Sequence, residues 1–390
     1  MRQSLMLEFD VKEYERRIEK LVKKMNESNI NAVILTSDEN TFYFSGFNSI
    51  VWDSKVSTPA IIVITDDGHL TVATTPGGVA TATVTSCADD IRTYGKDGYK
   101  DYIDAVVSVL EEKKLMDKNI GFEFGSGHKM HLNYTLSNQL FARLKDADCV
   151  DAASVLWAVR SVKSPAEVER IRECCRINTL AIQKGLDEVK EGTTEMELYR
   201  NIAAECFRLG AENTLVYGVR AGKERYSQGN CPPSHRPIRE GEIILIDGGP
   251  IYHGYFSDII REAVIGKPTD RQQEIFDVAR EALYVGLEAV KPGVTASSVC
   301  KAVDDFMDSS KFADINVYKN WCGHGIGVGV HECPMLDSVT HTVLEPGMTF
   351  SIEPYIYEEG VGSLGVEQNF LVTETGYEIL TPSRDELIRL

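Results

Sequence analysis

A ten-residue pattern that occurs twice constrains the fold of this 390-residue chain more than any other feature. Residues 185–194 and 286–295 share the pattern G-L-acid-x-V-K-x-G-x-T and lie 101 residues apart. In each copy we expect a helix to end at a glycine and a threonine to begin the next helix, with Thr194 and Glu197 spaced as a capping box. An apolar hairpin with two acidic residues follows each copy. Residues 161–390 are therefore predicted to form two related helix–helix–hairpin halves of one α+β domain, an internal pseudo-twofold repeat.

The first part of the chain has a different pattern. Its length allows a second domain, because a single hydrophobic core stops growing beyond about 250–300 residues. Helical periodicity near 14–25 and 101–113 alternates with short apolar runs, which stand at 32–36, 60–65, 70–73 and 120–124. We therefore expect an α/β N-terminal domain over residues 1–158 and a second domain over 159–390. Ser164, Pro165 and Glu167 predict the start of a helix that runs to about Val189.

Composition excludes several classes of partner. The formal net charge of −18 argues against binding to nucleic acid or to an anionic membrane, since both require a basic surface. The N-terminus has no apolar core of about seven residues typical of a signal peptide, and no run of about 18 apolar residues could span a membrane. The nine cysteines contain no C-x-x-C pair and are expected to be small buried groups in a reducing cytoplasm.

The first predicted hairpin, residues 242–258, carries Asp247 and Asp258. If its turn centres between Tyr252 and His253, the two aspartates face each other on adjacent strands, with Cβ atoms about 4.5–5.5 Å apart. Two carboxylates that close need a proton or a cation between them. The alternative is that Asp247 starts a turn and Asp258 is solvated, but Asp247 directly follows a buried apolar strand.

A glycine-rich segment surrounds His324. Glycines at 323, 325, 327 and 329 leave little side-chain bulk around this imidazole. A nucleotide-binding loop is the obvious alternative, but G-x-G-x-x-G is absent and no P-loop lysine follows. His331, seven residues on, suits either the same site or a hydrogen-bonded position in the core.

The second hairpin places Glu353 and Glu367 in strongly apolar strands, where a carboxylate is costly to bury without a cation or hydrogen-bond donors. Both hairpins of the repeat thus carry paired acids. With His324, they form a predicted set of ligands for two divalent metal ions, for which Mn²⁺ is our first choice and Co²⁺ or Zn²⁺ are alternatives. Such a centre indicates a hydrolase, because two metal ions activate water and stabilise a developing oxyanion.

These residues resemble the motifs of the pita-bread metallohydrolases: prolidase, aminopeptidase P, methionine aminopeptidase and creatinase. The matching segments are 246–249, 254–258, 323–327, 331–332, 344–347 and 352–354, together with Glu367. Residues 40–47 and 58–75 resemble the N-terminal domain of creatinase and prolidase, which methionine aminopeptidases lack. The resemblance therefore covers nearly the whole chain and makes a methionine aminopeptidase the less favoured member.

The resemblance also implies roles for individual residues. Asp247 would bind one metal ion, and His324 and Glu353 the other. Asp258 and Glu367 would bridge both, and Glu353 would also transfer a proton. His331 and His235 match family histidines that contact the substrate, although a histidine such as His235 is otherwise most often a surface loop residue. The resemblance further implies a homodimer.

Two departures from the family pattern bear on the substrate. Tyr355 stands where prolidases usually have glycine, and Gly365 where they usually have arginine. Creatinase has lost its metal ligands, whereas all five are retained here. We therefore expect a cytoplasmic Xaa-Pro dipeptidase or aminopeptidase that acts on short peptides. The alternatives are a hydrolase of a small non-peptide C–N substrate, such as an ectoine-type cyclic amidine or a guanidino compound, and a non-catalytic binding module.

Overall fold

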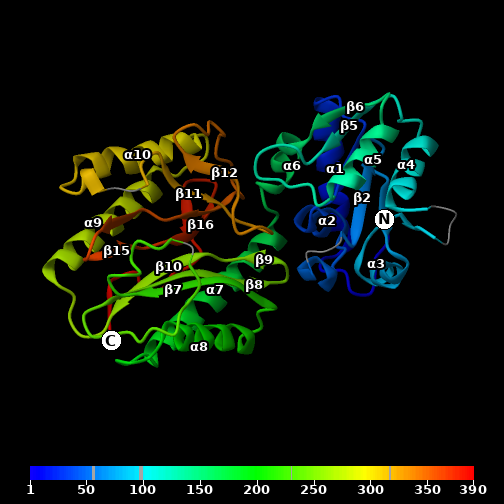
Figure 1. Ribbon diagram of the computed structural model, residues 1–390. Coiled ribbons are helices and arrows are strands. Elements are labelled where there is room, and N and C mark those ends of the chain that lie inside the picture. The colour runs from blue at the N-terminus through cyan, green and yellow to red at the C-terminus, as the bar shows by residue number, and fades with distance from the viewer. Residues whose placement is uncertain (55–57, 96–99, 230, 316–317) are drawn as a thin grey trace. The chain divides into compact units, whose positions relative to one another are not determined.

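The computed structural model describes residues 1–390 except 55–57, 96–99, 230 and 316–317. The chain divides into two compact units, Met1–Arg160 and Ser161–Leu390 (Figure 1).

The N-terminal unit is built on one mixed sheet of six strands in the order β4-β3-β2-β1-β5-β6. The strands are β1 (Ala32–Leu35), β2 (Ala60–Thr65), β3 (Leu70–Thr74), β4 (Asp90–Thr93), β5 (Asn119–Phe122) and β6 (Asp148–Asp151). The helices are α1 (Val11–Glu27), α2 (Asp38–Ser45), α3 (Val79–Thr85), α4 (Tyr102–Glu112), α5 (Tyr134–Arg143) and α6 (Ala153–Arg160), with short 3₁₀ turns at Ile50–Ser54 and Pro76–Gly78. Every predicted apolar run of this unit forms a strand, so its α/β class is confirmed.

The first helix shows how the pattern produces the packing. Asp10 caps α1 by accepting a hydrogen bond from the backbone N–H of Lys12. Tyr14, Ile18 and Leu21 recur on one face of the helix and are buried, so the periodicity of the sequence marks the face that packs on the unit's core.

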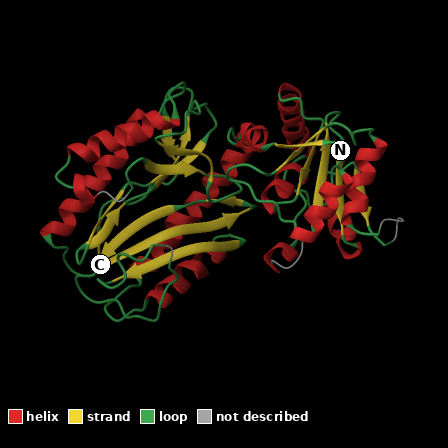
Figure 2. Cartoon of the chain, turned by 45° about the horizontal axis from the view of Figure 1, so that its top comes forward, coloured by secondary structure: helices red, strands yellow, loops and turns green. Residues whose placement is uncertain are grey.

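The C-terminal unit contains two five-stranded sheets and a two-stranded ribbon. The first half consists of α7 (Pro165–Asp187), α8 (Glu195–Arg208), β7 (Asn213–Ala221), β8 (Ile243–Tyr252), β9 (Tyr255–Phe256) and β10 (Ile259–Val264). The second consists of α9 (Asp270–Ala289), α10 (Ala296–Ser309), β11 (Trp321–Gly325), β12 (Glu332–Asp337), β13 (Thr349–Ile352), β16 (Gln368–Val372) and β17 (Tyr377–Ile379), with a 3₁₀ turn at Ala313–Ile315. β14 (Tyr355–Glu358) pairs with β15 (Gly362–Gly365), and β18 (Ile388–Arg389) joins the edge of the first sheet at β10. Figure 2 shows the helices as a layer outside the strands.

The two copies of the repeated pattern are folded alike. Thr194 and Thr295 are the N-caps of α8 and α10, and Thr194 forms the expected capping box with Glu197. The preceding helices end at Asp187 and Ala289, somewhat before the glycines of the turns. Apolar residues of α7 and α8 pack on the first sheet, and those of α9 and α10 pack on the second sheet and the ribbon.

Candidate metal centre

The turn of the first hairpin is centred one residue later than predicted, between His253 and Gly254. Tyr252 pairs with Tyr255, and Asp247 pairs with Ile260, so Asp247 and Asp258 are not directly opposite each other and that expectation is wrong. The reason lies in the turn: His253 and Gly254 both have positive φ angles, +47° and +79°, as a two-residue type I′ turn requires. The turn therefore centres between these two residues. The carboxylates still converge, because one oxygen each from Asp247, Asp258 and Glu367 lie within 4.8 Å of one another.

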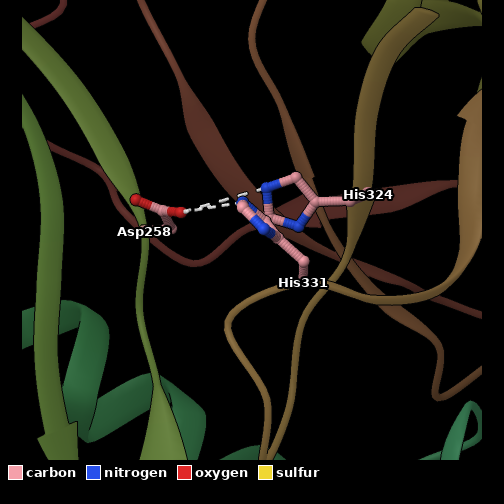
Figure 3. A group of neighbouring side chains, drawn as sticks. All are labelled: Asp258, His324 and His331. Atoms are coloured by element: carbon pink, nitrogen blue, oxygen red, sulfur yellow. Dashed lines mark ion pairs between the residues drawn. The ribbon is translucent and has the colours of Figure 1, made fainter. Parts of the chain in front are cut away.

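The second half supplies the remaining groups. His324 lies in β11, Glu353 directly follows β13, and Glu367 directly precedes β16. The Nε2 atom of His324 lies 3.2 Å from Oε1 of Glu353 and 3.9 Å from Oδ2 of Asp258. The structure thus brings all five predicted ligands together from distant parts of the unit. Figure 3 shows Asp258 directed toward the imidazoles of His324 and His331.

The electrostatics of this cluster require compensation. Burial, reinforced by the neighbouring carboxylates, raises the pKa values of Asp258, Glu353 and Glu367 well above their usual range. Burial also lowers the pKa of His324 to about 4, so the imidazole is neutral and can donate a lone pair. Within the described part of the chain, Asp258 Oδ1, His324 Nε2 and Glu367 Oε2 are buried without a hydrogen-bond partner. Four carboxylates and one neutral imidazole with such unsatisfied atoms fit two divalent cations of the hard or borderline class.

The backbone orients His324. Its Nδ1 atom lies 2.9 Å from the carbonyl oxygen of Gly325, which favours the tautomer with a proton on Nδ1 and leaves Nε2 to face the carboxylates. A side chain at Gly323 would overlap the carbonyl oxygen of Ser351 on the neighbouring strand. The glycine at this position is therefore needed for β11 and β13 to pair closely beside the histidine.

A buried polar network underlies the carboxylates, and sequence reasoning missed it. Asn369 Oδ1 accepts hydrogen bonds from the Asp258 N–H and the Ser257 hydroxyl, each 3.0 Å long. Its Nδ2 donates to the Asp258 carbonyl oxygen (2.6 Å) and to the Ser351 hydroxyl (3.2 Å), and Ser351 in turn donates to the Glu367 carboxylate. Asn369 thus connects both halves of the repeat. An asparagine inside an apolar strand was the available signal.

His331 lies at the mouth of the cluster. Its Nε2 atom is 4.0 Å from Oδ2 of Asp258, and its side chain is 62% exposed, so it is not the buried core histidine of the alternative reading. The following residue, Glu332, forms a buried ion pair with Lys163 (3.2 Å) and accepts a hydrogen bond from the Gly329 N–H. These contacts fix the loop that presents His331.

His235 is not brought to this site. It is exposed and is absent from the residues that line the cavity described below. The adjacent Ser234 donates its N–H and hydroxyl to the carboxylate of Glu195, in the first turn of α8. The role that the resemblance implied for His235 is therefore not supported by the structure, and the surface-loop alternative describes its position.

A cavity of about 330 Å³ opens on the cluster. Besides Asp247, Asp258, His324, His331 and Glu353, it is lined by Arg220, Gly229, Gly248, Gly249, Phe256, Tyr318, Trp321, Val330, Met335 and Tyr355. Sequence reasoning found Tyr355 but missed Arg220 and the aromatic residues at 318 and 321. The signal for Arg220 was a charged residue within the apolar run 219–221.

Comparison with known proteins agrees with this geometry. Residues 169–374 match the metallopeptidase family M24, and residues 17–162 match the creatinase/prolidase N-terminal domain. The chain belongs to metallopeptidase family M24.

Similarity to individual M24 proteins extends over nearly the full length. The chain is 28% identical to the Xaa-Pro dipeptidase of Pyrococcus furiosus, over 95% of this chain and 99% of that one. The Xaa-Pro dipeptidase from Bacillus anthracis has a similar structure, with a TM-score of 0.84, 26% identity and coverage of 97% and 100% of the two chains. The prolidase from Pyrococcus horikoshii gives a TM-score of 0.80 at 26% identity, over 96% and 100%. The expected two-domain pita-bread fold and the assignment as a hydrolase are thereby confirmed. Among the described residues, no helix is both long and apolar enough to cross a lipid bilayer.

Proposed function

We propose that this M24 metallopeptidase hydrolyses the amide bond of short Xaa-Pro peptides, with Asp247, Asp258, His324, Glu353 and Glu367 as ligands of two divalent cations. The observation that carries this proposal is the convergence of these five side chains, four of which line one cavity, with buried ligand atoms that have no hydrogen-bond partner among the described residues. The names of the similar proteins, which are Xaa-Pro dipeptidases and a prolidase, support the choice of substrate.

The residues of the site suit this reaction. When bound, a pair of divalent cations lowers the pKa of water and polarises a carbonyl group. Glu353 faces the cavity, and burial with the nearby Asp247 raises its pKa, so it can accept a proton from water and deliver it to the leaving nitrogen. His331, exposed at the mouth, is placed to donate a hydrogen bond to the carbonyl oxygen as negative charge develops. Phe256, Val330 and Met335 give the cavity an apolar wall that suits a pyrrolidine ring.

A second candidate is hydrolysis of a small non-peptide C–N substrate. Tyr355 lines the cavity and its hydroxyl donates to that of Tyr318, so an aromatic wall stands where prolidases usually have glycine. This wall favours a compact substrate. A non-catalytic binding module would not need four carboxylates and a neutral imidazole around one point.

The proposal also covers the metal ion, the cellular compartment and the oligomeric state. Mn²⁺ is proposed as the physiological metal because the ligands are mostly carboxylates. A reducing compartment, the cytoplasm, is proposed because all nine cysteines are free thiols. A homodimer is proposed from the family resemblance, and a monomeric mass in light scattering would remove it.

The test is hydrolysis of a panel of Xaa-Pro dipeptides and tripeptides by purified protein with Mn²⁺, with Co²⁺ and Zn²⁺ in parallel. Glu353→Gln is the matched control, since it keeps a similar shape but cannot transfer the proton. We expect cleavage of at least one proline peptide by the wild type and a loss of about 10²-fold or more in the variant. Cleavage of cyclic amidines or guanidino compounds alone would establish the second candidate instead.

A further inference from the structure

Arg220 is the one lysine or arginine among the described residues that line the cavity. It lies in β7 opposite Leu245 of β8, two positions along from the pair formed by Gly218 and Asp247. Residues related in this diagonal way have side chains that start about 7–8 Å apart on the same face of a sheet. The long arginine side chain therefore stands beside the acidic cluster. Arg220 and Asp247 both line the cavity.

The guanidinium is buried but incompletely satisfied. The residue is 6% exposed, its Nη1 atom donates to the carbonyl oxygen of Gln228 (2.6 Å), and its Nε atom has no partner within the described residues. No carboxylate of the described residues lies within ion-pair distance of it. Glu262 lies in the same row of the sheet, also opposite Leu245, but it forms no ion pair with Arg220, and within the described residues neither of its carboxylate oxygens has a hydrogen-bond partner. A buried cation without a counter-ion is costly unless a ligand provides one.

We propose that Arg220 binds the C-terminal carboxylate of the substrate and thereby selects dipeptides. This inference rests on the proposed peptidase function and adds the recognition of the substrate's free carboxylate. An arginine can bind a carboxylate through two parallel hydrogen bonds. In a dipeptide the carboxylate lies one residue, at most about 3.6 Å of chain, beyond the scissile bond, so it reaches Arg220 while the amide lies at the acidic cluster. Each additional residue moves the carboxylate past that position.

The arginine that the family pattern usually has two residues before the last glutamate is replaced by Gly365 in this chain. The cation in this cavity comes instead from β7. Tyr318 and Tyr355 close the wall near it, with ring centroids 4.3 Å apart and their hydroxyls hydrogen-bonded to each other. Arg220 and Tyr355 both line the cavity.

The experiment compares a dipeptide, Ala-Pro, with its C-terminal amide, Ala-prolinamide, in the metal-loaded wild type and in Arg220→Met, Arg220→Lys and Glu262→Gln. We expect the wild type to prefer the acid in kcat/KM by at least about 30-fold, as for other buried charge pairs. R220M should abolish this preference by slowing the acid while leaving the amide nearly unchanged, and R220K should restore part of it. E262Q should keep the preference. An equal loss on acid and amide in R220M would show a structural role and overturn the proposal.

A binding measurement separates this proposal from the proposed function. Calorimetry with proline and prolinamide on the same four proteins requires no cleavage. If the wild type cleaves no peptide but binds proline more tightly than prolinamide, and R220M does not, the peptidase assignment fails while carboxylate binding by Arg220 stands. If the wild type binds both compounds equally, the assignment of Arg220 is wrong whatever the protein cleaves. Thermal unfolding of R220M serves as the control for folding.

Discussion

Tyr355 and Gly365 are directly paired across β14 and β15, and a side chain at position 365 would overlap the Cβ atom of Tyr355. These are the two positions at which the chain departs from the usual prolidase pattern. Because they face each other, they are one coupled change rather than two independent ones. The tyrosine occupies space that an arginine at position 365 would need.

The first prediction follows from this pair. Gly365→Ala should destabilise the C-terminal unit by about 1–3 kcal/mol, because it introduces overlap into a packed strand pair. In Tyr355→Gly/Gly365→Ala the overlap with the tyrosine is gone, so part of the loss should be recovered. Thermal unfolding of the wild type, Tyr355→Gly, Gly365→Ala and the double variant gives the coupling free energy, expected at about 0.5–3 kcal/mol. Additive effects would show that the two positions are independent.

Metal removal should lower stability. A ligand that binds only the folded state at 100 times its dissociation constant contributes about 2.7 kcal/mol. Chelation of the purified protein should therefore lower the midpoint of thermal unfolding, and added Mn²⁺ should restore it. Asp258→Asn should reduce this difference, while Asp117→Asn, an exposed change in the N-terminal unit, should not. A midpoint that does not respond to chelator or Mn²⁺ would contradict the metal centre.

The metal-free protein should respond to pH in an unusual direction. The pKa values of Asp258, Glu353 and Glu367 are raised in the folded state, so the folded chain binds more protons than the unfolded one. These carboxylates therefore lower the free energy of unfolding at neutral pH. This loss of stability becomes smaller as the pH falls through their raised pKa values and they become protonated. In chelator, Asp258→Asn should have a larger free energy of unfolding than the wild type. This difference should be smaller at pH 5.5 than at pH 7. With Mn²⁺ present, protonation displaces the metal, and the trend should reverse.

The ion pair between Lys163 and Glu332 should matter for the loop that holds His331. Their side chains are 2% and 1% exposed, so Lys163→Met leaves a buried carboxylate without its cation. We expect a loss of about 3–5 kcal/mol. The double variant Lys163→Met/Glu332→Leu should recover much of it, since neither charge remains. Unfolding of the C-terminal unit by denaturant measures both effects, and a loss below about 1 kcal/mol in the single variant would show that the pair is not important.

Asn369 should tune metal affinity without being a ligand. Asn369→Ala removes the bonds that hold Asp258 and Ser351, and losses of this kind typically weaken metal binding by about 10–100-fold. Isothermal titration with Mn²⁺ measures this, and Gln183→Ala, on the exposed side of α7, is the control. Unchanged affinity would leave Asn369 with a purely structural role.

Short sequence patterns predicted many of the helices and strands of this protein and its metal-ligand candidates. The repeated pattern located four helices and the threonine caps of two of them, α8 and α10. Acidic residues in or beside apolar strands located four of the metal-ligand candidates, and the glycine-rich segment located the fifth, His324. The turn register failed because nothing in the hairpin's hydrophobic pattern revealed the positive φ angle of His253. The exposed position of His235, outside the lining of the cavity, was not predicted, because the contact of the adjacent Ser234 with Glu195 joins residues distant in the sequence. Arg220 and Asn369 acquire their roles only when strands from different parts of the chain meet at one cavity, which neither periodicity nor spacing reveals.

The most direct measurement is an anomalous difference map from crystals of the protein grown with Mn²⁺. Two peaks should lie among the carboxylates of Asp247, Asp258, Glu353 and Glu367, with His324 Nε2 beside one of them. Clear density for these side chains with no anomalous peak between them, at saturating Mn²⁺, would contradict the account.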